Sequence, residues 1–329
     1  MTRRVDFAAR NTPLQPIDHL AEAVGLPAGR LFVKRDDLTG LTGGGNKARK
    51  LEYLVADAIS AGADTLVTSG AAQSNHIRAT AAAARAQSLE CVAVMSTLHE
   101  QHQPHQPEGN LILDDLFGVQ VVWCGLDDRD ATAAEVEREL KAAGHRPYVI
   151  PLGGSNALGA SGYVTAADEI EVAVPGATVV CAAGTGGTMA GLAVGLGSCD
   201  RVIGVDVAAL PDLSERVLGL LGATADLVGR PAPSGQIRID ASQAAAPYGA
   251  PLLEVRDAIR LVARTTGLVL DPVYTGRAMA ALISWCRTGE LPDGPVVFLH
   301  SGGIPALFTQ RYSRWFETPR RFGDAPLAK

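Results

Sequence analysis

The 329-residue sequence has no apolar run long enough to cross a membrane and no block of basic residues. Its net charge of −6 and pI near 5.7 argue against nucleic acid as a partner. The first ten residues contain arginines but no apolar segment, so no secretory signal is expected there. These absences exclude a membrane protein and a nucleic-acid-binding protein.

Cysteine is also scarce, and the five cysteines show no CxxC spacing. This excludes a disulfide framework and predicts reduced core residues of a cytoplasmic protein. What the chain does have is 47% hydrophobic residues, enough for one large or two medium domains with ample cores. No internal repeat or low-complexity segment interrupts it.

Segments with strand and helix patterns alternate along the chain, which predicts an α/β fold with parallel sheets. Strands are expected at residues 31–34, 65–68, 91–95, 120–123, 148–151, 178–182, 202–207, 268–270 and 296–299. A Gly/Ser/Asn-rich junction at residues 152–160 is the expected crossing between two domains. Residues 211–251 are weakly patterned, and the polar tail after Phe308 is expected to be peripheral.

The most informative stretch is a glycine turn, residues 43–45, ahead of a predicted helix over residues 48–62. Asn46 suits the N-cap, so Lys47 falls in the first helical turn. The helix dipole disfavours a charge there and favours the neutral amine, which attacks carbonyl groups. The alternative is a surface lysine that follows a tight turn.

A second glycine-rich loop, residues 181–191, joins a predicted buried strand to a helix. Its backbone N–H groups, together with the helix N-terminus, can hold an anion. No Gly-Lys-Ser/Thr follows, and Met189 replaces the third glycine of the dinucleotide pattern. The loop therefore indicates a phosphate group rather than a nucleotide, unless it is only a tight turn.

Three further stretches leave predicted strands at the edge where open α/β sheets bind ligands. Ser74 either caps the helix that follows it or, with Asn75 and His76, contacts a carboxylate. Residues 271–276 and 300–303 are ligand contacts or ordinary turns. His99, His102 and His105 are spaced by three, but prolines break any helix there, so a surface loop is expected and no metal site.

Five motifs occur in a fixed order: GGNKARKLE (44–52), QSNH (73–76), GGSNALG (153–159), DPVYTG (271–276) and HSGG (300–303). With them, the chain resembles the D-cysteine desulfhydrase and 1-aminocyclopropane-1-carboxylate (ACC) deaminase family, from residue 11 to residue 308. This family is a branch of the fold type II, tryptophan synthase β-like enzymes that use pyridoxal 5′-phosphate (PLP). The resemblance implies a homodimer and two open parallel-sheet α/β domains with PLP between them. The large domain would comprise residues 1–47 and 156–329, and the small domain residues 48–155.

The resemblance also implies the roles of individual residues. Lys47 would hold PLP as a Schiff base, and Asn75 would meet the ring hydroxyl. The substrate would lie against Ser74, Asn75 and His76 on one side and Tyr248 and Tyr274 on the other. The catalytic residues would be Lys47, Ser74 and Tyr274. The phosphate would be held by Gly184, Thr185, Gly186, Gly187 and Thr188.

Two positions separate the branches of this family. ACC deaminases have Glu and Leu where this chain has Thr275 and Ser301. A hydroxyl beside the ring nitrogen leaves that nitrogen largely neutral, which suits expulsion of a β-leaving group. The resemblance thus implies a β-elimination lyase acting on D-cysteine or a related amino acid. The alternatives are ACC deaminase, L-cysteate sulfo-lyase, a β-replacement synthase and a PLP-binding protein without turnover.

Overall fold

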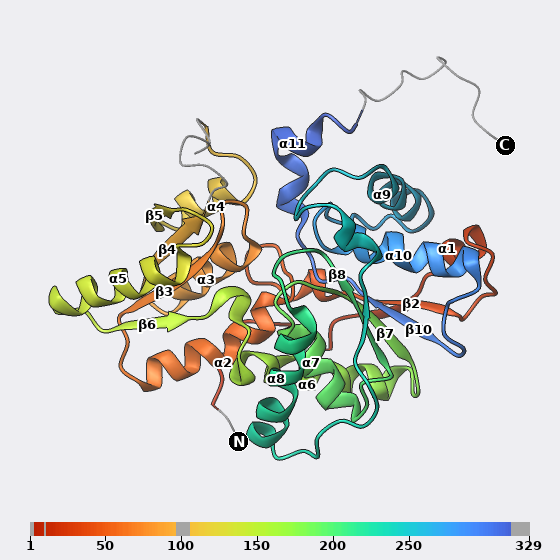
Figure 1. Cartoon of the computed structure of the whole chain (residues 1–329), viewed down its shortest axis with the longest axis horizontal. Coiled ribbons are helices and arrows are strands. Elements are labelled where there is room, and N and C mark those ends of the chain that lie inside the picture. Colours follow the sequence, from red (N-terminus) through yellow and green to blue (C-terminus); the bar gives the residue numbers. More distant parts are fainter. Residues whose placement is uncertain (1–2, 10, 97–105, 317–329) are drawn as a thin grey trace.

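The computed structural model describes residues 3–9, 11–96 and 106–316, which form two lobes that each contain a parallel sheet (Figure 1). The three histidines considered above for a metal site lie outside these residues. Within the described parts of the chain, no helix has the length and apolar character needed to cross a membrane.

The smaller sheet is contiguous in the sequence and entirely parallel, with the strand order β5-β4-β3-β6. Its strands are β3 (Thr65–Ala71), β4 (Glu90–Ser96), β5 (Gln120–Cys124) and β6 (Pro147–Ile150). The helices of this lobe are α2 (Lys47–Ser60), α3 (Asn75–Ala86), α4 (Asn110–Leu116) and α5 (Arg129–Ala142). The two central strands, β3 and β4, are almost entirely buried, as expected for strands covered on both faces, whereas the outer strands β5 and β6 are more exposed.

The larger sheet combines the two ends of the chain in the order β1-β2-β10-β7-β8-β9. Its strands are β1 (Leu14–Pro16), β2 (Leu31–Lys34), β7 (Thr178–Ala183), β8 (Val202–Asp206), β9 (Arg238–Asp240) and β10 (Val296–Leu299). Only β1 is antiparallel to its neighbour. Strand β10 therefore joins a strand from the beginning of the chain to strands from its second half.

Helices cover both faces of the larger sheet because successive strand residues point to opposite sides. Val296 and Phe298 pack on the face covered by α1 (Asp18–Ala23), α9 (Leu253–Thr266) and α10 (Thr275–Thr288). Val297 and Leu299 pack on the opposite face, under α6 (Ala157–Ala173), α7 (Gly187–Leu196) and α8 (Leu213–Val228). A short helix, α11 (Gln310–Ser313), ends the described chain.

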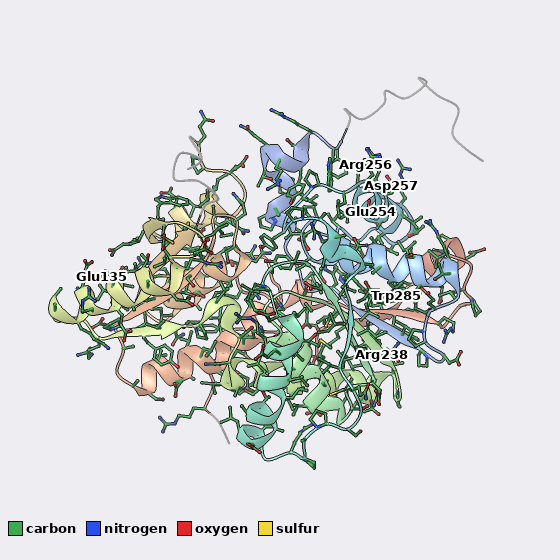
Figure 2. The ribbon with its side chains drawn as sticks, in the orientation of Figure 1. Glu135, Arg238, Glu254, Arg256, Asp257 and Trp285 are labelled. Carbon is green, nitrogen blue, oxygen red and sulfur yellow. The ribbon has the colours of Figure 1, made fainter. Side chains whose placement is uncertain are left out.

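Helix α9 illustrates how the amphipathic pattern sets its position. Val255, Ile259 and Val262 are buried in the core, at helical spacing. Glu254 and Asp257 are exposed on the outer side of the lobe (Figure 2).

The predicted strands agree with the structure except at residues 268–270, where the prediction is wrong. Leu270 is buried, yet this segment pairs with no strand. Strand β10 already has β2 and β7 on its two sides, and β8 has β7 and β9. The outer place beside β8 is taken by β9, which comes from the weakly patterned stretch.

A buried ion network attaches α2 to the larger lobe. Arg49 Nε donates to Asp36 Oδ2 over 2.8 Å, and Arg49 Nη2 donates to Glu169 Oε2 over 2.8 Å. Lys34 Nζ lies 2.6 Å from the same Glu169 oxygen. All four side chains are nearly inaccessible to solvent. The first turn of α2, which carries Lys47, is thereby fixed relative to the larger sheet.

Candidate active site

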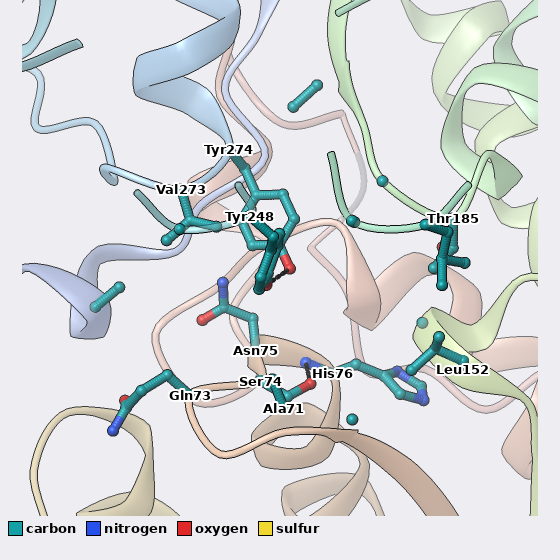
Figure 3. Close-up of a pocket in the computed structure, with 18 of the residues that line it drawn as sticks. Ala71, Gln73, Ser74, Asn75, His76, Leu152, Thr185, Tyr248, Val273 and Tyr274 are labelled. Atoms are coloured by element: carbon teal, nitrogen blue, oxygen red, sulfur yellow. Dashed lines mark hydrogen bonds between the residues drawn. The ribbon is translucent and has the colours of Figure 1, made fainter. Parts of the chain in front are cut away.

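A cavity of about 590 Å³ lies between the carboxyl ends of the strands of the two sheets. Its size is typical of a site for a small molecule or cofactor. It brings together eleven of the thirteen residues proposed from the sequence: Lys47, Ser74, Asn75, His76, Gly184, Thr185, Gly186, Thr188, Tyr248, Tyr274 and Ser301. Gly187 and Thr275 do not line it. Figure 3 shows residues from both lobes around this space.

Lys47 is the first residue of α2, as expected, and its side chain enters the cavity. Burial lowers the pKa of its amine to about 8, and its hydrogen bond to the Gly153 carbonyl is long at 3.4 Å. Asn46 is the N-cap residue, as predicted, but its side chain makes no capping hydrogen bond to the helix. The Asn46 side chain instead donates to Thr188 Oγ1 over 3.0 Å, which connects the two glycine loops.

Lys50 is a second cavity lysine, which the sequence analysis did not assign to the site. Its side chain is 1% exposed, and its Nζ donates to the Gly153 carbonyl and to Ser155 Oγ. Burial and the nearby Lys47 lower its pKa well below the ordinary value. Among the described residues no carboxylate lies within 4 Å of it. Its spacing of three from Lys47, on the same helix face, was the signal that could have revealed it.

The loop 184–188 faces the cavity at the N-terminus of α7. Gly186 has a positive φ of 84° at the N-cap, a conformation that favours glycine. Gly187 lies behind the loop, where a Cβ would be 2.6 Å from Ser155 Oγ and 2.9 Å from Lys50 Nζ. The helix N-terminus and the Lys50 amine, whose charged form a bound anion would favour, therefore act on the same space.

This arrangement fits a phosphate group. A buried ammonium without a counter-ion is unfavourable by itself, and a bound phosphate would supply the missing negative charge. Lys47 lies three residues before Lys50 on the same helix, and its partly neutral amine can react with a carbonyl carbon. The donor set thus matches a molecule that carries both a phosphate and an aldehyde, as PLP does.

The QSNH segment enters α3 at the cavity wall. Ser74 Oγ accepts from the backbone N–H groups of His76 and Ile77, so the capping role is confirmed. Among the described residues its hydroxyl donates to no acceptor, so its hydrogen is available to a ligand. His76 Nε2 lies 2.9 Å from Thr68 Oγ1, and burial together with the two lysines lowers its pKa well below the ordinary value. His76 is therefore neutral at physiological pH.

Two tyrosines face the cavity from the larger lobe. The hydroxyl groups of Tyr248 and Tyr274 are hydrogen-bonded to each other, and their rings are in an edge-to-face arrangement (Figure 3). Burial raises the pKa of Tyr274 to about 12 and that of Tyr248 well above its ordinary value. Both hydroxyls therefore stay protonated. One donates to the other, and the second can donate a hydrogen bond to a substrate.

The chain after Phe308 was expected to be peripheral, and for the described part this is wrong. Tyr312 on α11 is 3% exposed and lines the cavity. Its hydroxyl donates to the Gly249 carbonyl over 2.5 Å, next to Tyr248. A single buried aromatic residue within a polar tail gives no periodic signal, so the sequence pattern did not indicate it.

Arg277 is another residue that the sequence analysis missed. It is fully buried and donates to the carbonyl groups of Gln243 (2.9 Å), Pro247 (2.8 Å) and Val207 (3.1 Å). One guanidinium group thus organises the segment that carries Tyr248.

Thr275 and Ser301, the two branch-specific positions, occupy different environments. Thr275 Oγ1 donates to Asp271 Oδ1 over 2.7 Å and accepts from the Asp271 N–H over 2.8 Å. The Thr275 hydroxyl therefore holds the turn before α10, and Thr275 does not line the cavity, which differs from its expected place beside a cofactor ring. Ser301 lines the cavity, and its hydroxyl has no hydrogen-bond partner in the described parts of the chain.

Two parallel-sheet lobes with a cavity lysine and a glycine-rich helix N-terminus between them are features of a PLP-dependent enzyme. Residues 5–302 match the family described as pyridoxal-phosphate dependent enzyme, and the chain belongs to this family. A D-cysteine desulfhydrase of Yersinia pestis (strain Pestoides F) is 44% identical over 316 residues, which cover 93% of this chain and 95% of the relative.

Solved structures agree with this assignment. A crystal structure of an ACC deaminase homologue superposes with a TM-score of 0.83 at 36% identity, covering 93% of both chains. Threonine deaminase isoform 2 from Solanum lycopersicum has a TM-score of 0.63 at 18% identity, over 90% of this chain and 80% of that one. The latter similarity shows the fold alone, and it identifies the fold as that of fold type II PLP enzymes.

Proposed function

We propose that this protein is a β-elimination lyase that converts D-cysteine or a close analogue to pyruvate, ammonia and sulfide. The observation that carries the proposal is the position of Ser301. Within the segment 271–303, the cavity-lining residues include the neutral hydroxyl of Ser301 and no acidic side chain. A ring nitrogen held there would stay largely neutral, which suits loss of a good β-leaving group. The similarity to D-cysteine desulfhydrases supports the same substrate.

The residues proposed to hold PLP come from four segments that line the cavity. Lys47 would bind the aldehyde carbon covalently, while Lys50 and the loop 184–188 would bind the phosphate. Asn75 would contact the ring hydroxyl and Ser301 the ring nitrogen. When bound, PLP supplies an electron sink for a bond broken at the Cα atom of an amino acid.

The remaining steps depend on the protein's own groups. The Ser74 hydroxyl and the N-terminus of α3 would hold the substrate carboxylate, since that helix end attracts anions. Lys47 Nζ, with a pKa of about 8, can accept the Cα proton near neutral pH. The protonated tyrosine pair would donate a hydrogen bond to the departing sulfur, which leaves readily because a thiol has a pKa of about 8.5.

The test is a comparison of products. The wild-type protein should release pyruvate from D-cysteine and little 2-oxobutanoate from ACC, and Lys47→Ala should abolish both cofactor attachment and pyruvate release. Equal turnover of ACC and D-cysteine would reject the substrate assignment. Attachment of borohydride-reduced PLP to Lys34 or Lys50 would reject the role of Lys47.

The domain division at residues 47 and 155, a homodimer and a cytoplasmic location belong to the same proposal. Helix α2 packs against both α3 and α6, so it joins the two lobes. All five cysteines are free, and four are buried, which is typical of a reducing compartment. Light scattering should give twice the 34.2 kDa chain mass. The monomer mass at micromolar concentration would reject the dimer.

A further inference from the structure

Asn110, the first residue of α4, is fully buried beside the cavity, and each of its side-chain polar atoms has a partner. Its Nδ2 donates to the Gln73 carbonyl and to Asn75 Oδ1, both over 2.9 Å. Its Oδ1 accepts from Arg78 Nη1 over 3.2 Å. The cofactor-binding roles discussed above do not include this residue.

The chemistry of these partners determines the orientation of two amides. An arginine can only donate, so the Asn110 atom facing Arg78 must be its oxygen. A backbone carbonyl can only accept, so the atom facing Gln73 must be the Asn110 nitrogen. That nitrogen then requires an acceptor on Asn75, and the Asn75 oxygen is consequently directed away from the cavity centre.

The nitrogen of the Asn75 amide is left facing the cavity. Asn75 lines the cavity, and within the described part of the chain its Nδ2 has no hydrogen-bond partner. In Figure 3 this nitrogen lies on the side of Tyr248 and Tyr274, and the oxygen points the other way. The amide thus presents two N–H donors to a ligand.

We propose that Asn110, held by Arg78, is a positioning residue that fixes the Asn75 amide for an anionic oxygen on the cofactor ring. The inference rests on the proposed contact between Asn75 and PLP. An amide turned by 180° would direct its oxygen at that anion and replace attraction by repulsion. Arg78 also donates to the Gly44 carbonyl over 3.2 Å, so one guanidinium supports both the amide and the turn before Lys47.

The decisive variant is Asn110→Asp, which keeps the size of the side chain and the contact with Arg78. A carboxylate can only accept, so it would bond to the Asn75 NH₂ and turn the Asn75 oxygen into the cavity. The affinity of the apoprotein for PLP should fall about tenfold or more, measured by fluorescence titration without substrate. Asn110→Ala allows either orientation of Asn75 and should cost less affinity than Asn110→Asp.

A double-mutant cycle separates positioning from general damage. In an Asn75→Ala background, Asn110→Asp should change PLP affinity less than twofold. The same loss with and without Asn75, or a greater loss in Asn110→Ala than in Asn110→Asp, would overturn the proposal. Thermal unfolding of each apoprotein reports folding independently. Because no substrate is used, a protein that binds PLP but does not release pyruvate from D-cysteine would reject the proposed reaction and leave this test intact.

Discussion

The low pKa of Lys47 should govern how fast the apoprotein attaches PLP. Burial lowers this pKa to about 8, whereas an ordinary lysine side chain has a pKa of about 10.4. At pH 7 the neutral, reactive fraction is then about 9% instead of roughly 0.04%, a difference of roughly 200-fold. The attachment rate should rise tenfold per pH unit up to pH 8 and level off above it.

Stopped-flow absorbance of the apoprotein mixed with PLP, from pH 6 to pH 10, measures this rate. Nα-acetyl-lysine is the matched control, because dividing by its rate cancels the titration of PLP itself. The ratio should be nearly constant below pH 7 and fall roughly 35-fold between pH 8 and pH 10. A ratio independent of pH over the whole range would mean that Lys47 titrates like an exposed lysine.

The same shift bears on stability. A lysine whose pKa is lower in the folded state costs stability at pH values below 8, and this cost disappears as the pH rises from 8 towards 10.4. A pKa shift of about 2.4 corresponds to about 3 kcal/mol. This is the upper limit of the cost for the apoprotein, because the Lys47 side chain is only partly buried and solvent screens its charge. Apoprotein with Lys47→Met should therefore be more stable than wild type at pH 7, and the difference should shrink at pH 10.

Three other predictions address the cradle, the branch positions and the ion network. Gly187→Ala places a Cβ 2.6 Å from a neighbouring hydroxyl and should weaken PLP binding at least about tenfold by equilibrium dialysis. The control, Gly219→Ala, meets no atom within 4 Å and should leave affinity unchanged. Ser301→Ala should alter the absorbance of bound PLP and slow pyruvate release without loss of stability. Thr275→Val should instead lower the free energy of unfolding by about 1–3 kcal/mol and leave the absorbance of bound PLP normal. The reverse pattern would contradict the placement of these two residues. Arg49→Met leaves the buried Asp36 carboxylate without its cation, while Glu169 keeps Lys34, and should cost about 3–5 kcal/mol in urea unfolding, so a loss below about 1 kcal/mol would contradict this account.

Local patterns were enough to predict the parts of this protein that are determined locally. The glycine turn before Lys47 and the loop 184–188 depend on positive φ angles and helix starts, which leave clear signals in the sequence. Of the nine strands predicted from apolar runs, eight agree with strands of the structure. The ninth segment, residues 268–270, is apolar because it is buried, although it pairs with no strand. A buried segment without a pairing partner has the same apolar pattern in the sequence as a buried strand.

The residues that were missed act through contacts between distant segments. Arg277 collects carbonyl groups from residues 207–250, and Asn110 joins α4 to the start of α3. No spacing within either segment indicates such a contact. The difference between Thr275 and Ser301 is of the same kind, because both are small hydroxyl residues after a buried segment. Only the three-dimensional packing shows which of them reaches the cavity.

The position of β10 between β2 and β7 has a consequence for biosynthesis. The ribosome makes β2 near the beginning of the chain, and β2 gains its parallel partner only when β10 emerges near the end. The smaller sheet is contiguous and can form during translation, but the larger sheet must wait with unpaired strand edges, which are prone to aggregation. Ser301 lies two residues after the end of β10, so the cavity closes last. A nascent chain therefore exposes Lys47 long before it has a site for the cofactor, and premature termination ahead of β10 yields a polypeptide that cannot mature.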